Sequence, residues 1–191
     1  MQVDHRHGAD FEELDRAAPD LAGRRNLIFG LMGHISYSWS NNESMFIYVM
    51  QHLMQSDEIT ATLVFASLNT TRARIDLVER LANAHLQKKE IAAELRRIIR
   101  VFNRLTRLRN EFNHSFFQQD QTGEITHTYS MRIQKKAGVL TLGETKPMDD
   151  ARIQKMARAI NELSELNRDI RSLVPRLQVA MQSSPEAASA S

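Results

Sequence analysis

Cysteine is absent from the chain, and this absence excludes several kinds of chemistry. A protein without cysteine has no disulfide bond, no thiolate nucleophile and no cysteine-ligated zinc. The chain also contains no run of about 18 apolar residues, so we expect no transmembrane helix and no membrane partner. Residues 1–10 are polar and of mixed charge, which is unlike a signal peptide. These features favour a cytoplasmic protein.

Common motifs of phosphate binding and nucleophilic catalysis are missing as well. The sequence holds no glycine-rich phosphate loop, no nucleophile elbow and no Ser-x-x-Lys pattern. The formal net charge of +2 is too small to indicate a nucleic-acid partner. The distribution of charge along the chain is therefore more informative than its sum.

Arginine is concentrated in one segment. Residues 95–110 contain six arginines and no acidic residue. The arginines are Arg96, Arg97, Arg100, Arg104, Arg107 and Arg109. The guanidinium group is planar and permanently charged, and its geometry suits phosphate. Such a run is either a solvated helix face or a surface for an anionic ligand.

Apolar residues recur at helical spacing over most of the chain. The pattern predicts helices at residues 25–55, 59–87, 89–117 and 149–181. Ser56-Asp57-Glu58 is a signal for a new helix, and a bend is expected near residues 69–71. Pro175 should kink or end the last helix, because a proline inside a helix costs about 3 kcal/mol.

Between the third and fourth helical segments the period changes to strand-like alternation. Residues 124–133 alternate, and residues 139–145 can form the returning strand of a hairpin. We therefore predict an all-α fold, a bundle of four to five helices with a small β-hairpin insertion. The predicted organisation is an N-terminal arm at 1–23, one domain at 24–181 with the hairpin at about 124–145, and a disordered tail at 182–191.

The most distinctive motif is Arg-Asn-Glu-Phe-Asn-His at residues 109–114. It places Arg109, Asn110 and His114 within about one and a half helical turns. These groups can bind or cleave a phosphodiester without a metal ion. In an ideal helix Arg109 and His114 diverge by about 140°, whereas Asn110 and His114 share a face. Either the long arginine reaches around the helix, or two copies of the chain form one site.

Two charged residues occupy positions where the helical pattern expects apolar ones. Arg109 lies on the apolar stripe of the third helix, and Glu43 lies on that of the first. A charge at such a position is costly unless it is paired or faces a cleft. We hypothesise that Glu43 pairs with Arg109 and orients its guanidinium. The alternative partners of Glu43 are Arg72 and Arg74.

The pattern Arg109-Asn110-x-x-x-His114, on the third long helix of a bundle, resembles the R-x(4–6)-H motif of the HEPN superfamily (higher eukaryotes and prokaryotes nucleotide-binding domains). A polar residue directly after the arginine is also common in that family. The resemblance covers roughly residues 25–177. The hairpin is not part of the minimal four-helix pattern of the family.

This resemblance implies a metal-independent endoribonuclease without cofactors, in which two chains dimerise and their motifs face one another. His114 would act as general acid or base, Arg109 would stabilise charge on the scissile phosphate, and Asn110 would hold the phosphate or the histidine. The product would carry a 2′,3′-cyclic phosphate. The expected RNA-binding residues are Arg100, Arg104 and Arg107. A toxin or defence role, with a neutralising partner protein, follows from family analogy alone.

Other interpretations stay open from the sequence. HEPN-like domains also serve as non-catalytic RNA-binding or protein-interaction modules. A histidine near a helix end can simply cap backbone carbonyls. Residues Glu111 and His114 have the Glu-x-x-His spacing of di-iron bundles, but the only second match, Glu124 with His127, lies in the expected hairpin.

Overall fold

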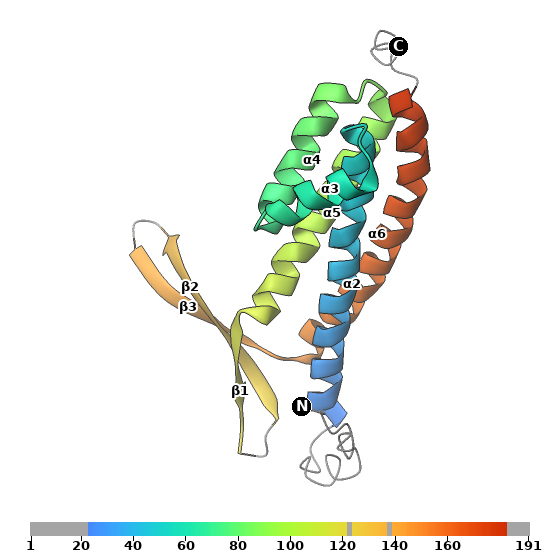
Figure 1. Ribbon diagram of the computed structural model, residues 1–191. Helices are drawn as coiled ribbons and strands as arrows, with labels where there is room; N and C mark the ends of the chain where they lie inside the picture. The colour runs from blue at the N-terminus through green and yellow to red at the C-terminus, as the bar shows by residue number, and fades with distance from the viewer. Residues whose placement is uncertain (1–22, 122–123, 137–138, 183–191) are drawn as a thin grey trace, which may run out of the picture.

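The computed structural model describes residues 23–121, 124–136 and 139–182. Within these ranges five helices and one antiparallel sheet follow one another (Figure 1). The helices are α2 (Gly23–Leu53), α3 (Glu58–Ser67), α4 (Thr71–His85), α5 (Lys89–Asn113) and α6 (Asp150–Gln182). The strands are β1 (Ser115–Gln119), β2 (Ile125–Lys136) and β3 (Val139–Pro147), paired in the order β1-β2-β3. The predicted helical bundle with a small β insertion is confirmed.

The predicted terminal segments fall almost entirely outside the described residues. Residues 1–22 and 183–191 are not described. Gly23, placed in the predicted arm, is the first residue of α2. Gln182, placed in the predicted tail, is the last residue of α6.

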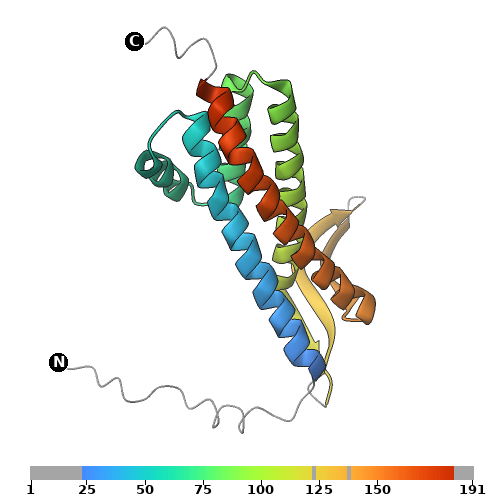
Figure 2. The ribbon, with the colours of Figure 1, turned by 90° about the vertical axis from the view of Figure 1, so that its right-hand side faces the viewer.

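The two longest helices, α2 and α6, form the axis of the bundle. They lie side by side and run in the same direction, while α5 runs the opposite way against both (Figures 1 and 2). At their N-terminal ends Arg24 Nη1 contacts Asp150 Oδ1 at 2.6 Å. Helix α4 packs on α2 and α5, and the short α3 crosses α2.

The core follows from the apolar stripes that the sequence carries at helical spacing. On α5 the buried residues are Leu95, Ile98, Ile99, Phe102, Leu105 and Phe112. Phe102 lies at the centre, with its ring centroid 5.7 Å from that of Trp39 and 5.1 Å from that of Phe46. Aromatic contacts at these separations join α2 to α5 firmly.

The second predicted helix is two helices, and the expected bend is a break. Helix α3 begins after Asp57, whose side chain accepts a hydrogen bond from the Thr60 amide. Helix α4 begins after Thr70, whose hydroxyl accepts from the Ala73 amide at 3.1 Å. Each cap satisfies an amide that has no partner inside its helix. The caps therefore offset the cost of starting two short helices where one long helix was expected.

The third predicted helix ends earlier than expected. It was predicted to reach residue 117, but α5 ends at Asn113, and the next residues form β1. Strand β1 pairs with β2, with Phe116 opposite Tyr129, so the predicted hairpin is a three-stranded sheet. Aromatic side chains fit a strand at least as well as a helix end, and the partner strand decides the outcome.

Pro175 lies inside α6 and does not end it, contrary to one of the two predicted outcomes. The helix continues to Gln182. Leu173 and Leu177, on either side of the proline, are fully buried in the core. Their packing offsets the hydrogen bond that the proline cannot donate.

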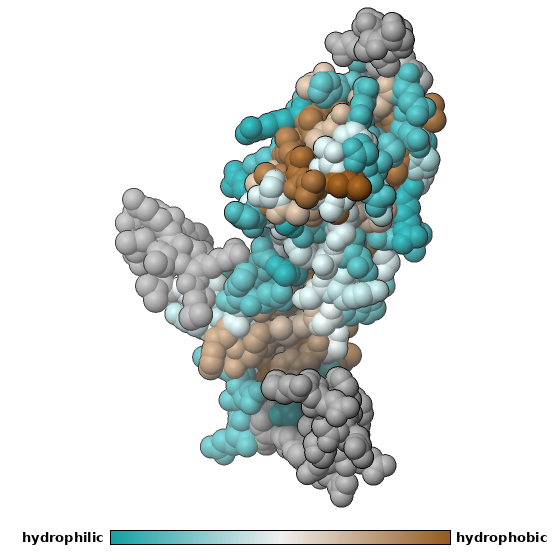
Figure 3. Space-filling view, in the orientation of Figure 1, coloured by the Kyte–Doolittle hydropathy of each residue, from teal (hydrophilic) through white to brown (hydrophobic). Residues whose placement is uncertain are grey.

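In the view of Figure 3 the surface is mostly polar, and one of its apolar patches lies over α3. There Ile59 is 73% and Leu63 66% exposed, while α3 buries only Ala61 and Phe65. None of the helices in the described ranges combines the length and the apolar character that crossing a lipid bilayer requires.

Candidate functional site

The motif residues line a surface cleft between the C-terminal part of α5 and the beginning of α4. Arg109, Asn110 and His114 all contribute to this cleft, whose volume is about 670 Å³. The opposite wall is formed by residues 69–72 and by Ile75 and Asp76 of α4. The structure thus brings the three predicted residues together in one chain, in spite of their angular separation on an ideal helix.

Arg109 is half-buried, and a tryptophan supports its charge. The guanidinium carbon lies 4.3 Å from the centroid of the Trp39 ring, and Nη1 donates to Asn110 Oδ1 at 2.9 Å. Trp39 is itself fixed, because its Nε1 donates to Thr106 Oγ1 at 2.8 Å and its ring stacks on Phe102. A cation over an indole face is stabilised electrostatically, which explains how arginine is tolerated on the apolar stripe.

His114 occupies the C-cap position of α5, where the backbone leaves helical geometry. Its φ is −115° and its ψ is 18°, so the angular rule for helical positions no longer applies to it. Its backbone amide donates to the Asn110 carbonyl at 3.1 Å, and its side chain is exposed. Among the described residues the imidazole has no hydrogen-bond partner, so carbonyl capping is performed by the backbone and not by the ring.

The cleft is electrostatically positive. Arg72, Arg107 and Arg109 line it, against the single carboxylate of Asp76. Arg72 Nε lies 3.7 Å from that carboxylate, in an exposed pair that neutralises little. The N-terminus of α4, capped by Thr70, also borders the cleft and adds partial positive charge. A helix N-terminus beside three arginine side chains is well suited to an anion.

Glu43 does not pair with Arg109, and this hypothesis was wrong. Glu43 is 9% exposed and lies 3.2 Å from Arg74 Nη1 of α4. Arg74 Nε also donates to two carbonyls at the C-terminal end of α3. Because α4 packs against α2 beside Glu43, Arg74 reaches the carboxylate, while Arg109 is held by Trp39, one helical turn away. Glu43 therefore connects three helices and does not orient the site.

The three arginines predicted to bind RNA have different surroundings. Arg107 is exposed and lines the cleft. Arg104 forms an ion pair with Glu162 of α6, which takes part of its charge. Arg100 is exposed and does not border the cleft. Part of the arginine run thus holds α5 to α6, and only Arg107 joins the motif residues.

Glu111 and His114, the pair with metal-ligand spacing, lie at different places. Glu111 Oε1 accepts from Lys146 Nζ at 3.1 Å and from Arg152 Nη2 at 2.9 Å. Burial lowers the pKa of Lys146, but its bonds to Glu111 and Glu144 outweigh burial, and the pKa lies above its usual value. In the described part of the chain no three His, Asp or Glu side chains are grouped so that they could hold a metal ion.

Two residues of the site were missed by sequence reasoning. Trp39 was assigned only to the apolar stripe of the first helix, and Thr106 was not singled out. The signal was present, because Trp39 lies one helical turn before Glu43, the residue that was considered as a partner of Arg109. An aromatic ring can stabilise the charge of an arginine on an apolar stripe, as a carboxylate can.

The assignment of this site rests on the residues themselves. Their arrangement is a positive cleft with a supported arginine, an amide and an exposed imidazole. Comparison with family models, with curated proteins and with solved structures finds no match to this chain.

Proposed function

We propose that the protein is a metal-independent endoribonuclease of the HEPN type, which cleaves RNA and leaves a 2′,3′-cyclic phosphate. The observation that carries the proposal is the cleft in which Arg109, Asn110 and His114 meet beside the N-terminus of α4. The finer parts of the proposal are a cytoplasmic homodimer and a toxin or defence role with a neutralising partner. They come from the same resemblance and rest on family analogy.

The reaction needs a base, an acid and a stabiliser of negative charge. The 2′-oxygen attacks phosphorus as its proton passes to a base, and the bond to the 5′-oxygen breaks as that oxygen receives a proton from an acid. An imidazole titrates near neutral pH and serves in either role. The exposed His114 is free to approach the ribose, and Arg109 donates to the phosphate oxygens on which charge develops.

A dimer would supply the second proton-transfer group. One imidazole from each chain allows one histidine to act as base while the other acts as acid. Asn110 accepts from Arg109 through Oδ1, so its NH₂ group remains to donate to the phosphate. We infer that two clefts face each other and that the RNA strand passes between them.

A second candidate function is a non-catalytic RNA-binding module. It is favoured by the lack of a hydrogen-bond partner for the His114 imidazole among the described residues, because catalytic histidines are commonly oriented by a second group. Both functions use the positive cleft to bind RNA, but only the ribonuclease cleaves the bound strand.

The test is cleavage of an end-labelled RNA in EDTA by the unmodified protein and by His114→Ala. We expect the unmodified protein to yield cyclic-phosphate ends, and His114→Ala to be slower by about 10²- to 10⁴-fold, as for loss of general acid–base catalysis. The matched control is His85→Ala, an exposed histidine at the end of α4 outside the cleft, which should keep full activity.

Two results would contradict the ribonuclease proposal. Equal cleavage by the unmodified protein and His114→Ala would show that the activity does not belong to this site. RNA binding by the unmodified protein without any cleavage would favour the non-catalytic module.

A further inference from the structure

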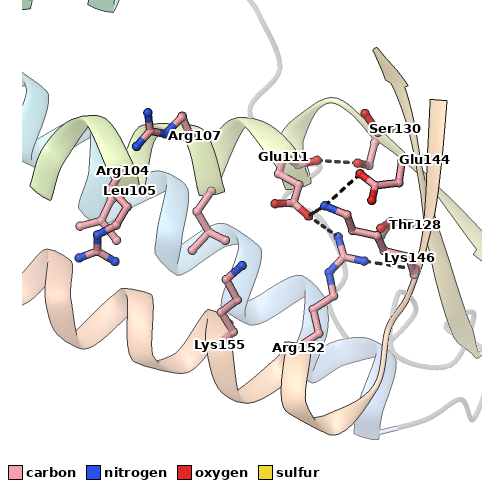
Figure 4. A pocket seen from close by; sticks show the side chains of 12 residues that line it. Arg104, Leu105, Arg107, Glu111, Thr128, Ser130, Glu144, Lys146, Arg152 and Lys155 are labelled. Carbon is pink, nitrogen blue, oxygen red and sulfur yellow. Dashed lines mark hydrogen bonds and ion pairs between the residues drawn. The ribbon is translucent and has the colours of Figure 1, made fainter. Parts of the chain in front are cut away.

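A second pocket lies next to the cleft, on another face of α5. Its volume is about 360 Å³, and it forms where α5, β2, β3 and α6 meet (Figure 4). Five cationic side chains and two carboxylates line it. The cations are Arg104, Arg107, Lys146, Arg152 and Lys155, and the carboxylates are Glu111 and Glu144.

The two carboxylates are already neutralised. Glu111 lies between Lys146 of β3 and Arg152 of α6, and accepts from both (Figure 4). Lys146 Nζ also lies 3.3 Å from Glu144 Oε2. Arg104 is paired with Glu162 beside the pocket. Each carboxylate of the lining therefore has a cationic partner within 3.3 Å.

Two cations of the pocket have no counter-charge. Neither Arg107 nor Lys155 forms an ion pair with a residue in the described ranges, and both are exposed. Lys155 projects from α6 toward α5 in Figure 4. The hydroxyl of Ser115, which also lines the pocket, already donates to the Glu111 carbonyl. The two unpaired cations are therefore the groups left to bind a phosphate.

The pocket and the cleft are joined through one side chain. Arg107 lines both. Residues Glu111 and Ser115 face the pocket, whereas their neighbours Asn110 and His114 face the cleft. The two cavities therefore flank α5, whose width is roughly 10 Å, a distance that a few nucleotides of single strand can span.

We propose that this pocket binds a backbone phosphate of the same RNA strand, a few nucleotides from the scissile one, through Lys155, and that Arg107 contacts the strand between the two cavities. The inference rests on the proposed function. It makes the sheet, through β2 and β3, part of the RNA-binding surface. The strand crosses α5 at Arg107 and continues to the wall formed by β2 and β3. Recognition is by backbone charge and is independent of base sequence.

The test measures RNA binding separately from cleavage. A fluorescent single-stranded RNA is titrated, at several salt concentrations, with His114→Ala protein so that the RNA stays intact. Adding Lys155→Ala should weaken binding by roughly tenfold, as for loss of one hydrogen bond to a charged group. It should also lower the slope of log K against log salt by about 0.7, the value for one phosphate contact on a single strand.

The matched control is Lys89→Ala, which removes the same charge at the other end of α5. Lys89 is exposed and lies 18 positions before Arg107, about 27 Å along the helix. Affinity and salt slope should be unchanged in this variant. Thermal unfolding of all variants confirms that each is folded.

The possible failures can be distinguished. If Lys155→Ala binds RNA with the affinity and salt slope of its parent, the inference about the pocket is overturned and the cleft proposal stands. If the parent binds no RNA at any salt concentration and the unmodified protein cleaves none, both proposals are overturned.

Discussion

At the scale of single residues, the two charged side chains at apolar positions are stabilised in different ways. Arg109 is stabilised by the face of Trp39, and Glu43 by Arg74. The first arrangement leaves Arg109 in the lining of the cleft. The second encloses both charges, with Arg74 at 22% and Glu43 at 11% side-chain exposure, and is structural.

The Glu43–Arg74 pair gives a first prediction on stability. Arg74→Met should leave the Glu43 carboxylate buried without a counter-charge, at a cost of about 3 kcal/mol in the free energy of unfolding. Urea unfolding followed by circular dichroism measures the loss. Replacing both residues, Glu43→Met with Arg74→Met, should recover most of it, because a well-packed apolar pair avoids the desolvation of two charges.

The control for that prediction is Arg72→Met. Arg72 pairs with Asp76 four residues away on the exposed face of α4, so the expected change is about 0.5 kcal/mol or less. An Arg74→Met protein as stable as Arg72→Met would contradict a structural role for the buried pair.

At the scale of elements, side-chain caps mark where α3 and α4 begin. Asp57 accepts from the Thr60 amide at 2.9 Å and from the Thr60 hydroxyl at 2.7 Å. These hydrogen bonds hold the pKa of Asp57 below its usual value of 3.8. The ionised form is therefore favoured in the folded protein.

This cap predicts a pH dependence. Because the folded-state pKa is lowered, the contribution of Asp57 is fully present above pH 3.8 and is lost as pH falls through the lower, folded value. The gap in urea midpoint between the unmodified protein and Asp57→Asn should therefore narrow as the pH is lowered below about 4. Glu58→Gln makes a similar change in the first turn of α3 without a cap bond, and its gap should stay small. A gap for Asp57→Asn that does not depend on pH would refute the explanation.

At the scale of the whole molecule, Glu111 connects the bundle to the sheet. It lies on α5 and binds Lys146 of β3 and Arg152 of α6, whose guanidinium also lies 5.1 Å from the Phe112 ring centroid. One carboxylate thus joins three elements that are far apart in the sequence. The side chain of Arg152 is 10% exposed, and the Glu111 carboxylate balances its largely buried charge.

Removing Glu111 should loosen the sheet more than the helices. In Glu111→Ala we expect faster amide hydrogen exchange in β3 and in the first turns of α6, with little change in α2. The loss of overall stability should be about 2 kcal/mol, because the network is partly exposed. Glu144→Ala removes an exposed carboxylate whose ion-pair partner among the described residues is Lys146, and serves as the control. If β3 and the first turns of α6 exchange at the same rates in Glu111→Ala as in Glu144→Ala, Glu111 does not join the sheet to the bundle.

The sequence allowed the fold class and most of the helical segments to be predicted, since both leave a local signal. It also indicated three residues that lie in one cleft, and their function stays a prediction. The break before α4 and the strand β1 depend on competition between a cap or a partner strand and a continuing helix. The pairing of Glu43 with Arg74, and the wall that α4 adds to the cleft, depend on which helices are neighbours. Periodicity along one helix identifies the buried face but not what covers it.

A single residue, His114, separates the last residue of α5 from the first residue of β1. Rotation about its φ and ψ would change the direction in which the strand leaves the bundle and would turn the imidazole with it. The far end of the sheet is tied back to the bundle, since β3 leads into α6 within three residues. A change in the tilt of the sheet relative to α5 would therefore also change the direction of the Cα–Cβ bond that carries the imidazole.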